Sequence, residues 1–262
     1  MHMRESEYTV DADARDFFIN GYMVRPFKQD VSLERLLATL RELMDKPKKD
    51  GFMWEEKYKH TEDLKPNAYD YDSIFVDFLF AQGLPQYLNR VTGFNLMLGD
   101  VALRRFFPGL SYMGWHRDTH FYTGQKSAGR MPPIFKIIFY AALGEEPSAQ
   151  LKVISGSHNR MFRTKLLDRA QTILARKASI KSSDADYFFF NSMIFHSVPS
   201  NITMKKPAIR LFYNFCQLSQ LQHFPGHESL HKTYQQKLAQ KPAAISPGIA
   251  VSQLQPAAAQ PA

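Results

Sequence analysis

The stretch YMGWHRD, residues 112–118, decides how the rest of the chain is interpreted. His116 and Asp118 are two residues apart, and side chains two apart on an extended strand point to the same face. An imidazole and a carboxylate on one face are two of the three ligands of a facial metal site, in which two histidines and one carboxylate leave positions open. The best candidate for the second histidine is His196, in FNSMIFHS at residues 190–197. The sequence therefore predicts a metal site built from two distant segments.

A His-x-Asp pair by itself is a weak signal, because most such pairs are surface or core residues without a metal. His196 has a similar alternative, since it lies between the apolar run YFFF at residues 187–190 and a turn. A histidine in that place either faces a cavity or satisfies backbone groups at the edge of the core. Facial sites of this kind are typical of non-haem Fe(II) oxygenases.

The composition favours a globular chain. It has 262 residues, 44% of them hydrophobic, which is enough for one sizeable domain or two small ones. The single cysteine, Cys216, rules out an internal disulfide and fits a reducing compartment. No apolar run has the length of a membrane span, and no secretory signal is evident at the N-terminus. We expect a cytoplasmic protein.

The formal net charge is +8, but the basic residues are scattered and form no nucleic-acid footprint. The simplest interpretation is a solvated basic surface. The more specific one is a preference for anionic small molecules or for an anionic membrane surface.

The order of elements predicts helices first and a β domain second. Helical spacing covers residues 11–20, 32–44 and 72–90, the last interrupted at Gly83 and Pro85, with a short strand at 22–27. Residues 51–72 read as an extended loop that covers a pocket. Strand-like runs follow at 95–107, 112–118, 133–143, 149–154, 187–195 and 207–218, and one helix interrupts them at 163–177. Several short strands separated by turns indicate a sandwich or barrel.

These elements divide the chain into a single domain, residues 1–231, and a tail. The domain has a helical part at about 11–92 and a β core at about 93–218. The Gln-, Ala- and Pro-rich residues 232–262 are expected to be disordered, because such a composition buries little apolar surface.

Two basic residues lie inside apolar strands. Arg210, in AIRLFY, is costly to bury unless its charge is paired. The partner is either a structural Asp or Glu or the carboxylate of a ligand, which the guanidinium fork binds with two N–H groups. The turn after His196 is expected to place His196 and Arg210 on adjacent antiparallel strands. Lys136, in IFKIIFY, either extends to the surface or binds an anionic co-substrate.

The order of these motifs resembles the phytanoyl-CoA dioxygenase family. It runs from His116-x-Asp118 through Gly156-Ser157-His158 and Asp186 to His196 and Arg210, and DFFINGYMV at residues 16–24 resembles the family's first helix and strand. The chain departs from the family pattern at Ser155, where proline is common, and at EPSAQ, residues 146–150, in place of Glu-Asn-Gly.

The resemblance implies a double-stranded β-helix, or jelly roll, of the cupin type with flanking helices. It implies Fe(II) held by His116, Asp118 and His196, and 2-oxoglutarate as co-substrate with O2, its far carboxylate anchored by Arg210. The implied reaction hydroxylates a small-molecule substrate and releases succinate and CO2. An anionic substrate is one alternative. Desaturation, epimerisation, ring formation and a non-catalytic binding role stay open, as does a zinc hydrolase. His120 is expected not to be a ligand, because the family pattern ends at Asp118.

Overall fold

The strands of the protein form two antiparallel sheets. The computed structural model describes residues 5–109, 113–118, 134–141, 151–160, 165–180, 183, 185–198 and 207–240. The larger sheet has seven strands in the order β1-β9-β6-β11-β4-β3-β2, and the smaller has four in the order β5-β10-β7-β8. In the first sheet these are β1 Tyr22–Pro26, β9 Asp186–Asn191, β6 Phe135–Ala141, β11 Ala208–Gln217, β4 Leu96–Phe106, β3 Thr61–Lys65 and β2 Met53–Tyr58; in the second, β5 Met113–His116, β10 His196–Val198, β7 Leu151–Ile154 and β8 Lys177–Ile180.

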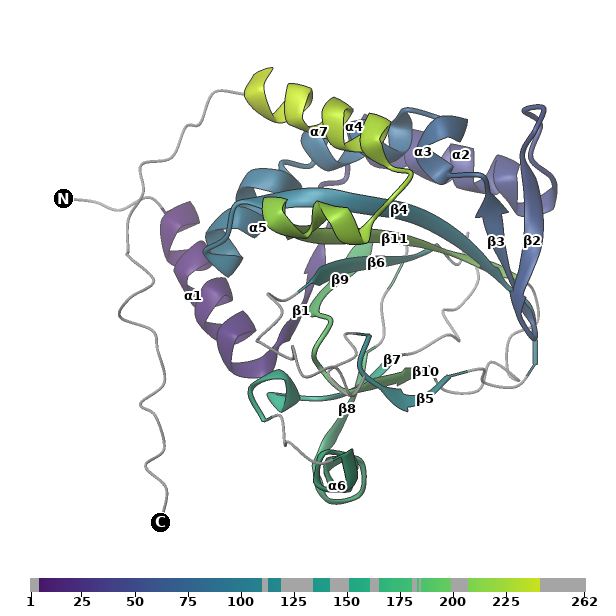
Figure 1. Ribbon diagram of the computed structural model, residues 1–262. Helices are drawn as coiled ribbons and strands as arrows, with labels where there is room; N and C mark the ends of the chain where they lie inside the picture. The colour runs from purple at the N-terminus through teal and green to yellow at the C-terminus, as the bar shows by residue number, and fades with distance from the viewer. Residues whose placement is uncertain are drawn as a thin grey trace, which may run out of the picture.

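Most helices cover the outer face of the large sheet, away from the small one (Figure 1). Side chains from both layers, such as Leu40, Phe78, Val101, Leu211 and Tyr234, share one core and are almost completely buried there. The helices are α1 Glu5–Asn20, α2 Val31–Asp45, α3 Ala68–Tyr71, α4 Ile74–Ala81, α5 Leu84–Thr92 and α7 Glu228–Gln240, with a 3-10 helix, η2 Leu218–His223, before the last.

A second core fills the space between the sheets. It combines Tyr140, Phe188 and Phe190 of the large sheet with Val153 and Val198 of the small one. Alternation along each strand produces this arrangement, because every second side chain of β6, β9 and β11 points to the inner face. The predicted fold class, mainly β with flanking helices and a jelly-roll core, is confirmed.

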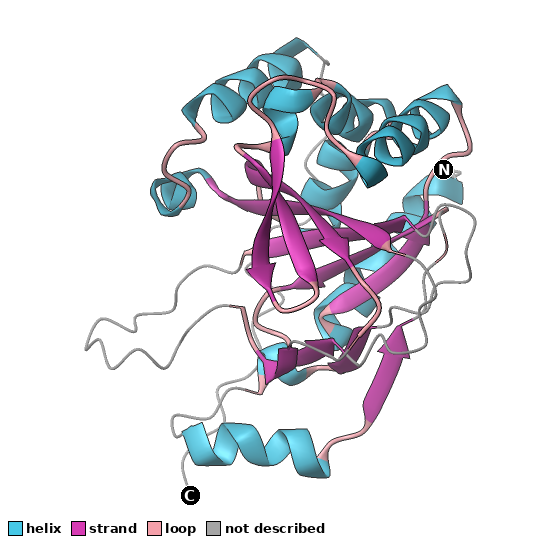
Figure 2. Ribbon diagram, turned by 90° about the vertical axis from the view of Figure 1, so that its right-hand side faces the viewer, coloured by secondary structure: helices cyan, strands magenta, loops and turns pink. Residues whose placement is uncertain are grey.

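Helix α6, Lys165–Leu174, lies apart from the other helices, beyond the small sheet. Figure 2 shows the same separation from a perpendicular direction. A 3-10 helix, η1 Ser157–Asn159, precedes it, and β8 follows it.

Three expectations about elements need correction. Residues 51–72 are not a covering loop: they form the β2–β3 hairpin at the edge of the large sheet and the short α3. The strand expected at 187–195 ends at Asn191, and a turn separates it from β10. Strand β8 was not predicted, because KASI is short and mixed in polarity.

The expected disordered tail begins too early. Residues 232–240 belong to α7, whose Leu230 and Tyr234 are buried against the large-sheet core. An ion pair between Lys237 and Asp77 at 2.7 Å also holds this helix, and the polar composition of the tail gave no sign of these specific contacts. Residues 241–262 lie outside the described residues.

Candidate metal centre

His116 and His196 face each other across two paired strands. β10 pairs with β5 so that His196 is directly opposite His116, and the centroids of the two imidazole rings are 4.2 Å apart. Directly opposed residues on antiparallel strands have the shortest side-chain separations in a sheet. The pairing of β5 and β10 thus brings together two histidines that are far apart in the sequence.

Asp118 lies just beyond the end of β5 and completes the group. Its backbone N–H donates to Ser192 O at 3.0 Å, which fixes the chain where the strand stops. Its Oδ1 is 3.4 Å from His116 Nε2, and its Oδ2 is 3.4 Å from His196 Nε2. One ligand atom from each residue lies within 4.8 Å of the others, and no second group of this kind occurs among the described residues.

The ring orientations suit a metal. Nδ1 of His116 is 2.8 Å from Gly114 O, and Nδ1 of His196 is 3.1 Å from Ile194 O. A carbonyl accepts only from a protonated nitrogen, so each Nε2 carries the lone pair, as is usual for histidine ligands. A first-row metal with bonds of about 2.0–2.2 Å keeps neighbouring ligand atoms about 3 Å apart. The three residues therefore fit a divalent metal of this size.

The protonation states of His196 and Asp118 suit a metal too. Burial lowers the pKa of His196 to about 4, so its ring is neutral at neutral pH. Burial also opposes protonation of His116, but contacts with Asp118 and the Gly114 carbonyl raise its pKa above the ordinary value. Burial alone would raise the pKa of Asp118, but Lys136 and the two imidazoles hold it well below its usual range. The site thus contains a carboxylate anion ready to bind a cation.

Lys136 is part of this cluster and does not extend to the surface. It points inward from β6, and its Nζ is 2.8 Å from Asp118 Oδ2. An ammonium group has three N–H donors, so this contact leaves others for an anionic group bound at the same place.

Arg210 lies in the core between the sheets, only 2% exposed. Its Cζ is 3.8 Å from the ring centroid of Phe106 and 4.4 Å from that of Tyr140, its neighbour on β6. At these distances the electron-rich ring faces attract the guanidinium cation, which helps to hold Arg210 in the core. Tyr140 and Lys136 are four residues apart on β6, so Arg210 and Lys136 share the inner face about 13 Å apart along the strand.

The expected adjacency of His196 and Arg210 is wrong. β10 belongs to the small sheet, and β11 pairs with β4 and β6 in the large one. From β9 to β11 successive strands alternate between the two sheets, so the two residues lie on different walls of the same interior.

Arg117, between the candidate ligands His116 and Asp118, has a role that sequence reasoning missed. Its side chain forms a bidentate ion pair with Asp168 of α6, at 2.9 and 3.1 Å. It also donates to the carbonyls of Ser157 and Met193, and both charged side chains are 1% exposed. This pair ties the ligand-bearing segment to α6. The available signal was Asp168, an acid within the run KLLDRAQTIL.

The Gly156-Ser157-His158 turn supports the site from outside. Ser157 Oγ accepts from the Phe195 N–H at 2.8 Å, next to His196. His158 packs on Gly21, where an added Cβ would lie 2.3 Å from its ring, and its Nε2 is 3.1 Å from Phe18 O. The turn therefore joins the first helix to the strand that carries His196. His120, which was expected not to be a ligand, lies outside the described residues, as do residues 121–131.

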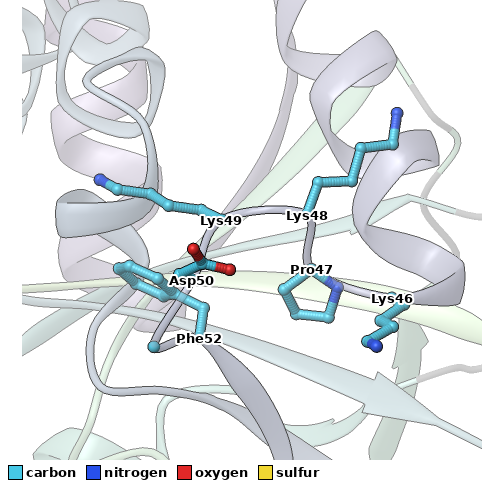
Figure 3. Close-up of a pocket in the computed structure, with 7 residues that line it drawn as sticks. Lys46, Pro47, Lys48, Lys49, Asp50 and Phe52 are labelled. Carbon is cyan, nitrogen blue, oxygen red and sulfur yellow. The ribbon is translucent and has the colours of Figure 1, made fainter.

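A surface pocket elsewhere does not resemble a binding site. Residues 46–52, between α2 and β2, line it, and none of the three candidate ligands does (Figure 3). The ammonium groups of Lys46, Lys48 and Lys49 point in different directions rather than toward a common point. The site described above thus remains the best candidate on chemical grounds.

Two facing antiparallel sheets with the candidate ligands between them define a double-stranded β-helix. Solved structures share this fold. The crystal structure of the non-heme alpha ketoglutarate dependent epimerase SnoN from nogalamycin biosynthesis is similar at a TM-score of 0.65 with 14% identity, over 84% of this chain and 89% of that one. HygX from Streptomyces hygroscopicus, with nickel, 2-oxoglutarate and hygromycin B bound, has a TM-score of 0.58 with 12% identity, over 83% and 88%.

EctD from S. alaskensis, with 2-oxoglutarate and 5-hydroxyectoine, has a TM-score of 0.57 with 16% identity, over 79% of this chain and 76% of that one. No protein-family profile matches the chain, and no curated protein matches it. The phytanoyl-CoA dioxygenase family therefore stays a prediction, while the fold is established. Among the described residues, no helix is long and apolar enough to cross a bilayer.

Proposed function

We propose that the chain is an Fe(II)- and 2-oxoglutarate-dependent oxygenase that hydroxylates a small-molecule substrate. The observation that carries this proposal is the convergence of His116, Asp118 and His196, with both Nε2 atoms turned toward the carboxylate. Two histidines and one carboxylate are the ligand set of such oxygenases. Iron with 2-oxoglutarate and O2 supplies the oxidising chemistry, and 2-oxoglutarate leaves as succinate and CO2.

The residues around the ligands have separable roles in this proposal. Arg210 binds the far carboxylate of 2-oxoglutarate, because its guanidinium fork is buried on the inner wall beside the rings of Phe106 and Tyr140. Lys136 holds one oxygen of Asp118 and offers its remaining N–H groups to a carboxylate at the metal. The apolar side chains between the sheets exclude water from the reacting groups.

The presence of Asp118 supports one oxidative outcome over the others. Related halogenases lack the carboxylate and have room for halide there, so the presence of Asp118 supports hydroxylation. Epimerisation is the second candidate, since the structurally similar SnoN is titled an epimerase. Both outcomes use the same ligands and differ in how the substrate is placed. The basic net charge supports a substrate with anionic character.

Anaerobic titration tests the function directly. Adding Fe(II) and then 2-oxoglutarate to the full chain is expected to produce a weak visible charge-transfer band, followed by succinate formation when air is admitted. A zinc-loaded sample is the control and should show neither. A chain that binds zinc and hydrolyses esters, or that binds 2-oxoglutarate without forming succinate, would refute the proposal.

Arg210→Ala is expected to weaken 2-oxoglutarate use. Removing one partner of a buried charged pair costs about 2–5 kcal/mol, and each 1.4 kcal/mol or so is a factor of ten. The apparent KM for 2-oxoglutarate should rise more than about tenfold, with iron affinity little changed. Arg210→Lys should recover only part of the loss, because the planar fork is absent. A lower melting temperature with normal 2-oxoglutarate binding would instead make Arg210 a structural residue.

A further inference from the structure

Helix α6 exposes its apolar side chains to solvent. Leu166, Leu167, Ile173 and Leu174 are 81%, 55%, 78% and 84% exposed. They are spaced i, i+1, i+7 and i+8, so they form a single stripe along the helix. A surface helix of a globular protein normally turns such a stripe toward the core. In α6 the stripe points outward.

The opposite, polar face of α6 is the one that packs against the protein. Asp168 and Gln171 lie there, both buried. Asp168 pairs with Arg117, and Gln171 Nε2 donates to Asp168 Oδ1 at 2.8 Å and to Arg160 O at 2.6 Å. Rotating the helix to bury the leucines would break a buried ion pair, which is strongly unfavourable. The outward direction of the apolar stripe is thus fixed by the fold.

The segment of chain that carries the stripe is strongly basic. Residues 160–182 contain seven basic residues and one acid, Asp168, for a net charge of 7 − 1 = +6. The single acid is neutralised inside the protein by Arg117. The basic residues whose side chains are exposed in the structure are Arg160, Arg169, Arg176 and Lys177.

We propose that α6 docks on the surface of an anionic lipid bilayer. Its aliphatic side chains enter the boundary between headgroups and acyl chains, and the basic residues contact the headgroups. The helix projects from the end of the molecule opposite the helical layer, so a flat surface can reach it (Figures 1 and 2). Because Asp168 and Arg117 are in contact, the docking helix is one ion pair away from the segment that carries the candidate ligands.

Charge favours an anionic bilayer over two other occupants of the stripe, a second copy of the protein and the C-terminal residues 241–262. A second copy that packed its α6 on this stripe would bring two segments of net charge +6 together, and like charges oppose association. Residues 241–262 contain Lys241 and no acidic residue, so they offer no complementary charge either. An anionic surface satisfies both the apolar stripe and its basic surroundings.

Vesicle co-sedimentation of the full chain tests the proposal. The protein should bind phosphatidylcholine vesicles that contain phosphatidylglycerol, bind pure phosphatidylcholine vesicles far more weakly, and be released by salt. The double variant L166Q/L174Q should bind at least about tenfold more weakly, because two apolar insertions are lost. Arg169→Glu with Lys177→Glu should weaken binding to the anionic vesicles too.

The matched control is V31Q/L218Q. Val31 and Leu218 are 77% and 61% exposed on other elements, so this variant removes similar apolar surface and should bind vesicles as the parent does. Equal melting temperatures show that each variant folds. Failure of the parent to bind anionic vesicles, or full binding by L166Q/L174Q, overturns the proposal. A concentration-dependent dimer in sedimentation velocity that L166Q/L174Q abolishes also overturns it and assigns the stripe to a second copy.

Discussion

The Asp118→Ala variant is expected to lose both tight iron binding and succinate formation. Asp118 is the only anionic member of the candidate ligand set, and Lys136 Nζ lies 2.8 Å from it. Without the carboxylate, the ammonium group stays beside the position of a divalent cation and repels it. The loss of iron affinity should exceed the about 10–100-fold that changes in outer-shell residues cause. Metal analysis after gel filtration and succinate assays measure both effects.

A second substitution separates ligand loss from charge repulsion. Lys136→Met added to Asp118→Ala should restore part of the iron affinity but not turnover, because the repulsion is removed and the ligand is still missing. His116→Ala and His196→Ala should also abolish turnover while the fold is retained. Asp118→Gly should lower hydroxylation sharply, with a coordination position opened. Normal iron binding in Asp118→Ala would remove it from the ligand set and make His120 the next candidate.

Arg117→Met is expected to destabilise the fold severely. The substitution leaves Asp168 as a buried, uncompensated charge and removes donors to the Ser157 and Met193 carbonyls. Breaking a buried ion pair by removing one partner typically costs about 3–5 kcal/mol. Denaturant unfolding, monitored by circular dichroism, measures the loss in free energy of unfolding.

Two further variants show whether the buried pair itself is responsible. The double substitution Arg117→Met with Asp168→Leu should recover much of the stability, because no charge is left buried. Arg35→Ala removes a pair with Asp72 that is largely exposed and 3.4 Å long, and it should cost at most about 1 kcal/mol. A cost for Arg117→Met no larger than that of Arg35→Ala would contradict the structural role of the pair.

The sequence by itself determined several helices and strands and the most informative residues. Apolar residues at helical spacing predicted α2, and the interruption at Gly83 and Pro85 predicted the separate helices α4 and α5. These signals are readable because helix formation depends on neighbours three and four positions away. The two-residue spacing of His116 and Asp118 predicted a shared face for the same reason, since side-chain direction along a strand is a local property.

Only the tertiary structure decided which segments meet. That His196 lies directly opposite His116, and that Arg210 lies on the other sheet, depends on strand pairing between distant segments, which the sequence of each strand leaves open. Lys136 could reach either the surface or the interior, and packing against Asp118 selected the interior.

The direction of α6 was decided in the same way. Its apolar residues form a stripe that a surface helix normally turns toward the core. The ion pair between Asp168 and Arg117 turned the polar face inward instead. Separating a buried ion pair costs more free energy than leaving these leucines exposed to solvent. A long-range contact between two charges thus outweighed a local hydrophobic pattern.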